Sequence, residues 1–201
     1  MDLAVIAITF GAIFIVELPD KTFIAALVLS TRYKPLSVWI GVGLAFLIQT
    51  LIAVTVGTIV TELVPDWIIR LVTMLIFLIG ALVLLRTAPG AEAGEKEQEE
   101  EYTKATTEER SAFKAVGASF LVLFAAEWGD LSQILTINFV ARFHEHVEVF
   151  IGAWGALLTV SGLAVLVGRV LLRYMRLSLL HYIGAVVCLG LAAWSLYEIL
   201  A

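Results

Sequence analysis

Six long apolar segments constrain this chain more than any other feature of its sequence. Each approaches or exceeds the ~20 residues that a helix needs to cross a bilayer. Hydrophobic residues make up 61% of the 201-residue chain and charged residues 15%, and the mean hydropathy of +0.98 lies outside the range of soluble domains. The alternation typical of a membrane barrel is absent, so we expect an all-α membrane protein. The six predicted spans are residues 3–29, 36–60, 67–85, 113–140, 149–170 and 177–200.

The two halves of the chain resemble each other. The first carries ELPDKT at residues 17–22 and the second carries EWGDLS at residues 127–132, so that acids and hydroxyl residues match at a spacing of 110. Gly41 corresponds to Gly152 after a slip of one residue. Because three spans end on the opposite side of the membrane from where they began, the second copy must be inverted, an architecture typical of transporters. The predicted units are a first three-helix repeat at residues 1–86, an acidic linker at 87–112 and a second, inverted repeat at 113–201.

Basic residues predict the orientation. Of the 13 Lys and Arg residues, ten fall in loops on one side of the predicted spans, Arg70 and Arg142 fall on the other side, and Lys21 lies within a span. The side rich in Lys and Arg is normally cytoplasmic. We therefore expect a multi-pass protein of a bacterial inner (plasma) membrane with both termini outside. Most of the acidic excess behind the net charge of −5 lies at residues 89–110, which we interpret as a solvated, mobile tether in the cytoplasm.

Charged residues inside the apolar segments point to function. A charge at the centre of a membrane helix costs ~2.5–3.5 kcal/mol on insertion scales, and the two motifs place four acids and one lysine there. A simpler interpretation is an ion pair between Glu17 and Lys21, four residues apart on one helix. The second motif argues against it, because Leu131 replaces the lysine and leaves Glu127 and Asp130 without a local cation. A bound metal ion or protons would supply the missing positive charge.

The spacing of the motifs favours a metal site. Glu and Asp three residues apart project from the same face of a helix, so each motif directs two carboxylates to one point. Pro19 and Gly129 predict a break in the helix at each motif, and discontinuous helices supply ion ligands in transporters. These hard oxygen ligands suit Mn²⁺, Ca²⁺ or Mg²⁺. Imidazole and thiolate are not expected in the core, so zinc and copper are poorer candidates.

Further polar residues extend the predicted site. Gln133 directly follows the second motif, and Gln49 lies within the second span, where we expect it next to the ligands. Glutamate has the higher intrinsic pKa of the two acidic residue types, so Glu17 and Glu127, with Lys21, are the predicted proton-coupling groups. The predicted metal ligands are Glu17, Asp20, Thr22, Glu127, Asp130, Ser132 and Gln133.

The paired motifs resemble those of the uncharacterised protein family UPF0016, the GDT1 family of TMEM165-like cation/proton exchangers. The family pattern is E-x-G-D-[KR]-[ST], found twice, in two three-span repeats joined by an acidic loop. The resemblance covers essentially the whole chain and implies exchange of Mn²⁺ or Ca²⁺ for protons at the motif acids. This chain departs from the pattern at Pro19, where the family has glycine, and at Leu131, where it usually has a basic residue.

We therefore expect a secondary transporter that exports a divalent cation, Mn²⁺ or Ca²⁺, in exchange for protons. The alternative is a small-solute or amino-acid exporter of the lysine-exporter type, for which Lys21 would have to bind the substrate carboxylate. An enzyme is not expected, because no H-E-x-x-H or G-x-S-x-G motif is present. No cofactor is predicted, and the metal ion is the substrate. The expected partners are the metal ion, protons and the lipid bilayer, with no nucleic acid, and a homo-oligomer is compatible with the sequence.

Overall fold

The computed structural model describes residues 1–18, 20–105, 111–174 and 177–200, and within these residues the protein is helical without strands. This confirms the all-α prediction. The helices are α1 (Leu3–Glu17), α2 (Lys21–Arg32), α3 (Pro35–Leu63), α4 (Asp66–Thr87), the short 3₁₀ helix η1 (Ala88–Gly90), α5 (Ala91–Ala105), α6 (Ala112–Ala126), α7 (Leu131–Phe143), α8 (His146–Tyr174) and α9 (Leu177–Leu200).

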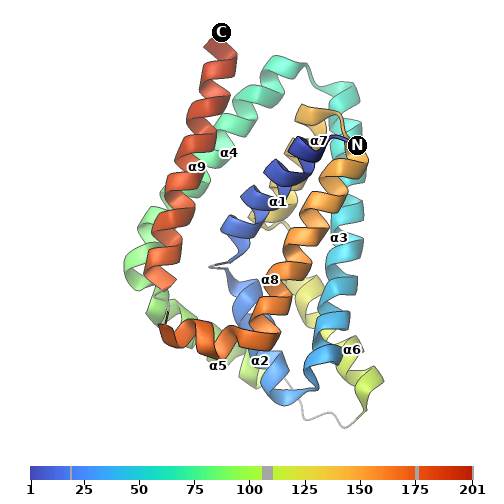
Figure 1. The fold of residues 1–201 in the computed structure, drawn as a ribbon, viewed down its shortest axis with the longest axis vertical. Coiled ribbons are helices and arrows are strands. Elements are labelled where there is room, and N and C mark those ends of the chain that lie inside the picture. The colour runs from blue at the N-terminus through green and yellow to red at the C-terminus, as the bar shows by residue number, and fades with distance from the viewer. Residues whose placement is uncertain (19, 106–110, 175–176, 201) are drawn as a thin grey trace.

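Two of the predicted spans are divided into half-helices. Among the described residues, four spans are single helices long and apolar enough to cross a membrane, and they belong to α3, α4, α8 and α9. The pairs α1–α2 and α6–α7 are bent by 70° and 72°, and counting each pair as one span gives six. Both bends fall at the ELPDKT and EWGDLS motifs, so the charged residues lie where the helices are interrupted (Figure 1).

The two halves of the chain make equivalent packing contacts. Helix α1 packs on α8, and α6 packs on α3. A side chain at Gly152 would collide with the backbone of Ile6 and Phe10, and one at Gly41 would collide with the backbone of Val116 and Phe120, the residues 110 positions later. Both crossings therefore require glycine for close approach. The stacked pairs Phe10–Phe14 and Phe120–Phe124 repeat the same correspondence.

The acidic linker contains an ordered helix. The sequence predicts a mobile tether here, and this is wrong for residues 91–105, which form α5 and pack against α2. Figure 1 shows α5 at one end of the bundle, beside the end of α2, whereas both chain termini lie toward the other end. We call these the linker end (Arg32, Thr87 and α5) and the terminal end (Phe143 and Leu200).

Candidate metal centre

Each break begins with a glutamate and ends with an aspartate. Glu17 is the last residue of α1 and Glu127 is the C-cap of α6, whereas Asp20 and Asp130 are the N-caps of α2 and α7. The N–H of Asp20 donates to the carbonyl of Glu17 at 3.1 Å, and that of Asp130 donates to the carbonyl of Glu127 at 3.4 Å. The C-terminal ends of α1 and α6 and the N-terminal ends of α2 and α7 thus meet at the site, so helix dipoles of both signs face it.

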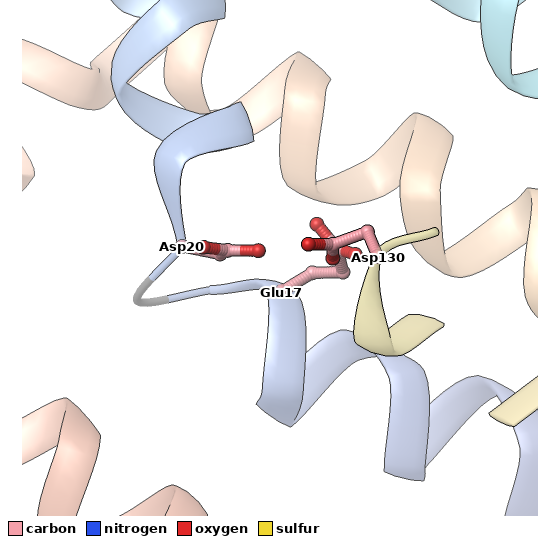
Figure 2. A group of neighbouring side chains, drawn as sticks. All are labelled: Glu17, Asp20 and Asp130. Carbon is pink, nitrogen blue, oxygen red and sulfur yellow. The ribbon is translucent and has the colours of Figure 1, made fainter. Parts of the chain in front are cut away.

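Three carboxyl groups from the two motifs meet in one place. One carboxyl oxygen each from Glu17, Asp20 and Asp130 lies within 4.8 Å of the other two. Figure 2 shows the three side chains pointing toward one another from the α1–α2 break and from the start of α7. Oxygen atoms at this spacing suit a hard divalent cation, whose ligands lie 2.0–2.6 Å from the ion. The two halves of the chain each contribute to the cluster.

The two glutamates of the site are buried, the two aspartates are partly buried, and the site is short of positive charge. The Glu17 side chain is 0% exposed and Glu127 is 3% exposed. Within the described part of the chain, neither carboxyl oxygen of Glu17 has a hydrogen-bond partner, and one oxygen each of Glu127 and Asp130 also lacks one. Buried carboxylates without partners are costly. The arrangement therefore requires a bound cation or protons.

Lys21 pairs with the second motif instead of the first. Its ammonium nitrogen lies 3.0 Å from a carboxyl oxygen of Asp130. The alternative of a Glu17–Lys21 pair assumed one continuous helix, whereas α1 ends at Glu17 and Lys21 begins α2. The second motif has Leu131 at the position that corresponds to Lys21 and so has no lysine of its own. Lys21 of the first motif supplies this positive charge by pairing with Asp130. The pair joins the two halves of the chain at the site.

Glu127 lies on the α3 side of the cluster. The hydroxyl of Thr22 donates a 2.6 Å hydrogen bond to one of its carboxyl oxygens, again across the two halves. Glu127 also lines a void of about 10 Å³ together with Gln49, Ser132 and Gln133, a space for about one water molecule. Thr22 and Ser132 are both buried, each in the first turn of its half-helix.

The two predicted glutamines support the second break. The backbone N–H of Gly129 donates to the side-chain oxygen of Gln133 at 2.9 Å, and Gly129 has φ of 74°, a conformation that favours glycine. The side-chain nitrogen of Gln49 donates to the carbonyl of Phe124 at 2.9 Å, near the end of α6. The helix-break prediction at Pro19 lies outside the described residues.

A cavity of about 500 Å³ connects the acids with the linker end. It is lined by Asp20, Lys21 and Asp130 at one side and by Gly94 and Gln98 of α5 at another. His181 also lines it, although no imidazole is expected in the core from the sequence analysis. The sequence does indicate His181 as a residue of interest, because it is a histidine within the last apolar segment. Nothing in the sequence placed α5 beside the acids.

Tyr102 of α5 reports how close the linker helix comes to the site. The side chain is half-buried against the main apolar core. Burial, together with the negative charge of Glu127, raises the pKa of the Tyr102 phenol to about 12. The direction of this shift places α5 within electrostatic reach of Glu127.

Comparison with known proteins finds several relatives that are similar over most of this chain. A GDT1-like protein of Synechocystis is 32% identical over 90% of this chain and 95% of its own length. The chloroplast protein PAM71 of Arabidopsis thaliana is 30% identical over 96% of the chain, and a chloroplast GDT1-like protein of Oryza sativa is 29% identical over 96%. The chain spans 56% of PAM71 and 62% of the rice protein. No solved structure matches it.

The family comparison covers both halves of the chain. Residues 5–92 and 115–201 match the family described as divalent cation/proton antiporter GDT1. The two matched segments contain both acidic motifs and leave out most of the linker helix. The activity in the family's description is that of the cation exchanger, not of the small-solute exporter. The chain belongs to the GDT1 family of divalent cation/proton antiporters.

Proposed function

We propose that this protein exports Mn²⁺ or Ca²⁺ from the cytoplasm in exchange for protons, at a site formed by Glu17, Asp20 and Asp130 with Glu127 beside it. The observation that carries the proposal is the convergence of three carboxyl groups, one buried and two partly buried, from two matching helix breaks, with oxygen atoms within 4.8 Å of one another. Carboxylate oxygens are the ligands that these hard cations prefer.

Charge balance explains why cation and protons exchange. The site holds the four motif acids and one ammonium group, that of Lys21. When the divalent cation leaves, the remaining negative charge is buried, and protons are the available replacement. When the cation binds, its charge favours the ionised carboxylates and expels those protons. Occupation by metal and occupation by protons are then mutually exclusive, which is what antiport requires.

Glutamates and aspartates take different roles in this proposal. Glu17 and Glu127 are the principal proton carriers, supported by the deep burial of both side chains. Asp20 and Asp130 are the more persistent metal ligands, supported by their position on the wall of the large cavity, where a cation arrives first. Thr22, Ser132 and Gln133 add neutral oxygens close to Glu127, two of them around the small void.

Alternating access is supported by the paired contacts of the two halves. The matching glycine crossings at Gly41 and Gly152 are the contacts expected of two inverted three-helix repeats. Such repeats have two pseudo-equivalent arrangements that open one site to opposite faces of the membrane. The cavity lies on the linker side of the acids, so this structure corresponds to the arrangement that faces the cytoplasm if the linker is cytoplasmic.

The decisive experiment is metal binding to the purified protein at acidic and alkaline pH, with proton release followed in weakly buffered solution. We expect tighter binding of Mn²⁺ or Ca²⁺ as pH rises, with protons released on binding. Glu17→Gln and Glu127→Gln should each abolish proton release, whereas Asp20→Asn and Asp130→Asn should first weaken metal affinity. The exposed linker acid Glu97 gives the matched control, and Glu97→Gln should change neither. Affinity that is independent of pH would leave a channel or a uniporter.

A further inference from the structure

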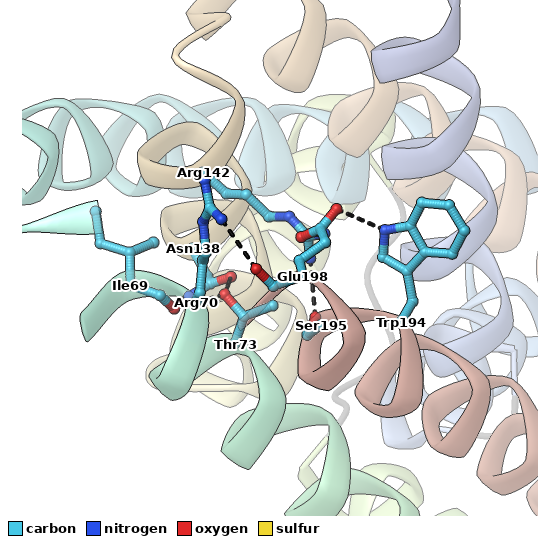
Figure 3. A network of polar contacts seen from close by, with 8 residues as sticks. All are labelled: Ile69, Arg70, Thr73, Asn138, Arg142, Trp194, Ser195 and Glu198. Carbon is cyan, nitrogen blue, oxygen red and sulfur yellow. Dashed lines mark hydrogen bonds and ion pairs between the residues drawn. The ribbon is translucent and has the colours of Figure 1, made fainter. Parts of the chain in front are cut away.

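A network of polar contacts joins α7 to α4 and α9 at the terminal end (Figure 3). The Arg142 guanidinium donates to the hydroxyl of Ser195 at 2.9 Å and forms an ion pair with the carboxylate of Glu198 at 2.5 Å. The indole N–H of Trp194 donates to the other carboxyl oxygen of Glu198 at 2.7 Å. Arg70 donates to the backbone carbonyl of Glu198 at 3.1 Å. Arg142 and Arg70 are the two basic residues that the sequence assigned to the outer side.

Two more contacts lie beneath this network, nearer to the metal centre. The Thr73 hydroxyl of α4 donates to the side-chain oxygen of Asn138 at 2.6 Å, and both side chains are buried. Next to Asn138 on α7, the ring of Phe139 lies 6.0 Å from that of Phe77 on α4. On α7, Phe139 and Asn138 lie three and four positions before Arg142, so both lie on the side of the helix that carries Arg142. That helix begins directly after Asp130, so the layers fix the position of a carboxylate of the site.

The equivalent arginine at the linker end is not held in this way. Arg32 lies 110 residues before Arg142, at the end of α2, and its side chain is exposed. The Arg142 side chain is only 12% exposed. The large cavity reaches the acids from the linker end. Arg142 therefore fastens the bundle at the end away from this cavity, beside a second cavity of about 470 Å³ whose described lining includes no residue of the metal centre. The matching arginine is exposed at the linker end.

We propose that Arg142 is a positioning residue for exchange: its contacts with Glu198 and Ser195 hold α7 against α9, keep the metal centre closed toward the terminal end, and break when the centre opens there. This inference rests on the proposed exchange function, and it adds the contact that selects the face to which the centre opens. Glu198 was not singled out from the sequence, although it is an acid within the last apolar segment, which is a signal for a functional or paired residue.

The strength of the contact suits a reversible closure. Hydrogen bonds to charged groups are stronger than those between neutral groups, but the Glu198 side chain is 31% exposed, so solvent weakens the ion pair. Loss of such a contact should change the population of the arrangement open at the terminal end by about tenfold, which corresponds to ~1.4 kcal/mol. The contact can therefore bias the two arrangements without locking either of them.

The test measures access to the metal centre from the terminal end. In a Cys188→Ala background, which removes the chain's single cysteine, Thr136→Cys on α7 serves as the reporter, because Thr136 lines the small void beside Glu127. A membrane-impermeant thiol reagent is added to each face of sealed vesicles in turn. We expect Arg142→Gln and Glu198→Gln to raise the rate of labelling from the terminal face by about tenfold. The charge swap Arg142→Glu with Glu198→Arg should restore slow labelling.

Arg32→Gln is the matched control, and it should leave labelling from the terminal face unchanged. Unchanged labelling in well-expressed Arg142→Gln and Glu198→Gln, or an equal increase in Arg32→Gln, would overturn the inference. If Arg142→Gln does not fold, Ser195→Ala removes one acceptor of Arg142 and should give a smaller increase. Asp20→Asn is tested in parallel: normal metal binding by Asp20→Asn would reject the proposed ion site, whereas the labelling rates judge Arg142 separately.

Discussion

At the scale of single residues, Lys21 is the group that competes with an incoming cation. Its ammonium nitrogen lies 3.0 Å from Asp130, one of the three acids whose oxygens converge with Glu17 and Asp20. A unit positive charge this close repels a divalent cation strongly at the intermediate dielectric of a protein interior. In the proposed site, a cation that ligates the other carboxyl oxygen of Asp130, which has no hydrogen-bond partner among the described residues, is still repelled by this ammonium.

Replacing Lys21 should therefore tighten metal binding. We expect Lys21→Met to raise the affinity for Mn²⁺ by about tenfold at alkaline pH, where the carboxylates are ionised, a change of ~1.4 kcal/mol. Equilibrium binding to purified protein checks this. Lys104→Met is the control, because Lys104 pairs with Glu100 on the exposed surface of α5, and it should have no effect. Weaker binding by Lys21→Met would mean that the lysine organises the acids more than it opposes the metal.

The meeting of the motif acids could be predicted from the sequence, whereas their role as metal ligands stays a prediction. Two copies of one motif in corresponding spans predict that their acids converge, because equivalent positions of two repeats meet near the middle of the membrane. The partner of Lys21 could not be predicted. Residues 17 and 21 are one turn apart on a continuous helix, and only the bend between α1 and α2 separates them.

At the scale of elements, the α6–α7 break depends on Gly129. Its φ of 74° costs a residue with a side chain roughly 1–2 kcal/mol. No neighbour would touch an added Cβ, so the backbone conformation alone decides the effect. We expect Gly129→Ala to lower the free energy of unfolding by about 1 kcal/mol and to impair transport by displacing Asp130. Thermal unfolding in detergent and metal uptake into proteoliposomes measure the two effects.

Gly117 provides the control for this substitution within α6. It also has open space around it, but it lies in the interior of the helix, where alanine is favoured over glycine by roughly 1 kcal/mol. Gly117→Ala should therefore be neutral or stabilising and should transport normally. Equal destabilisation by the two substitutions would show that added volume, rather than the positive φ, is responsible.

The elements differ in how well the sequence predicts them. The spans were predictable because apolar length is a strong signal in a bilayer. The linker helix α5 was missed because its charge was given more weight than its helix propensity: AEAGEKEQEEEYTKA consists mainly of Ala, Glu, Lys and Gln, which favour helices. Tyr102, half-buried on α5, is the residue that distinguishes a packed helix from a solvated tether.

At the scale of the whole molecule, the structure is asymmetric between its two ends. The acids are reached from the linker end through a cavity of about 500 Å³, whereas packed rings and polar contacts between α4, α7 and α9 lie on the other side of them. During transport, an antiporter must close the end that is open and open the end that is packed. The orientation of the chain decides which of the two ends faces the cytoplasm, and the bias of Lys and Arg predicts that the linker end does.

Cysteine labelling can measure this asymmetry in the intact protein. In the Cys188→Ala background, Gly94→Cys places a thiol on α5 at the cavity wall, where a side chain meets open space, and Leu131→Cys places one beside Asp130 on the same wall. We expect an impermeant reagent to label both from the cytoplasmic face and neither from the outer face. Mn²⁺ should slow the labelling of Leu131→Cys because the cation occupies the adjacent acids, but leave Gly94→Cys unchanged. Labelling of Gly94→Cys from outside intact cells would show that the predicted orientation is wrong. Labelling of Leu131→Cys that does not respond to Mn²⁺ would show that the cavity is not part of the metal pathway.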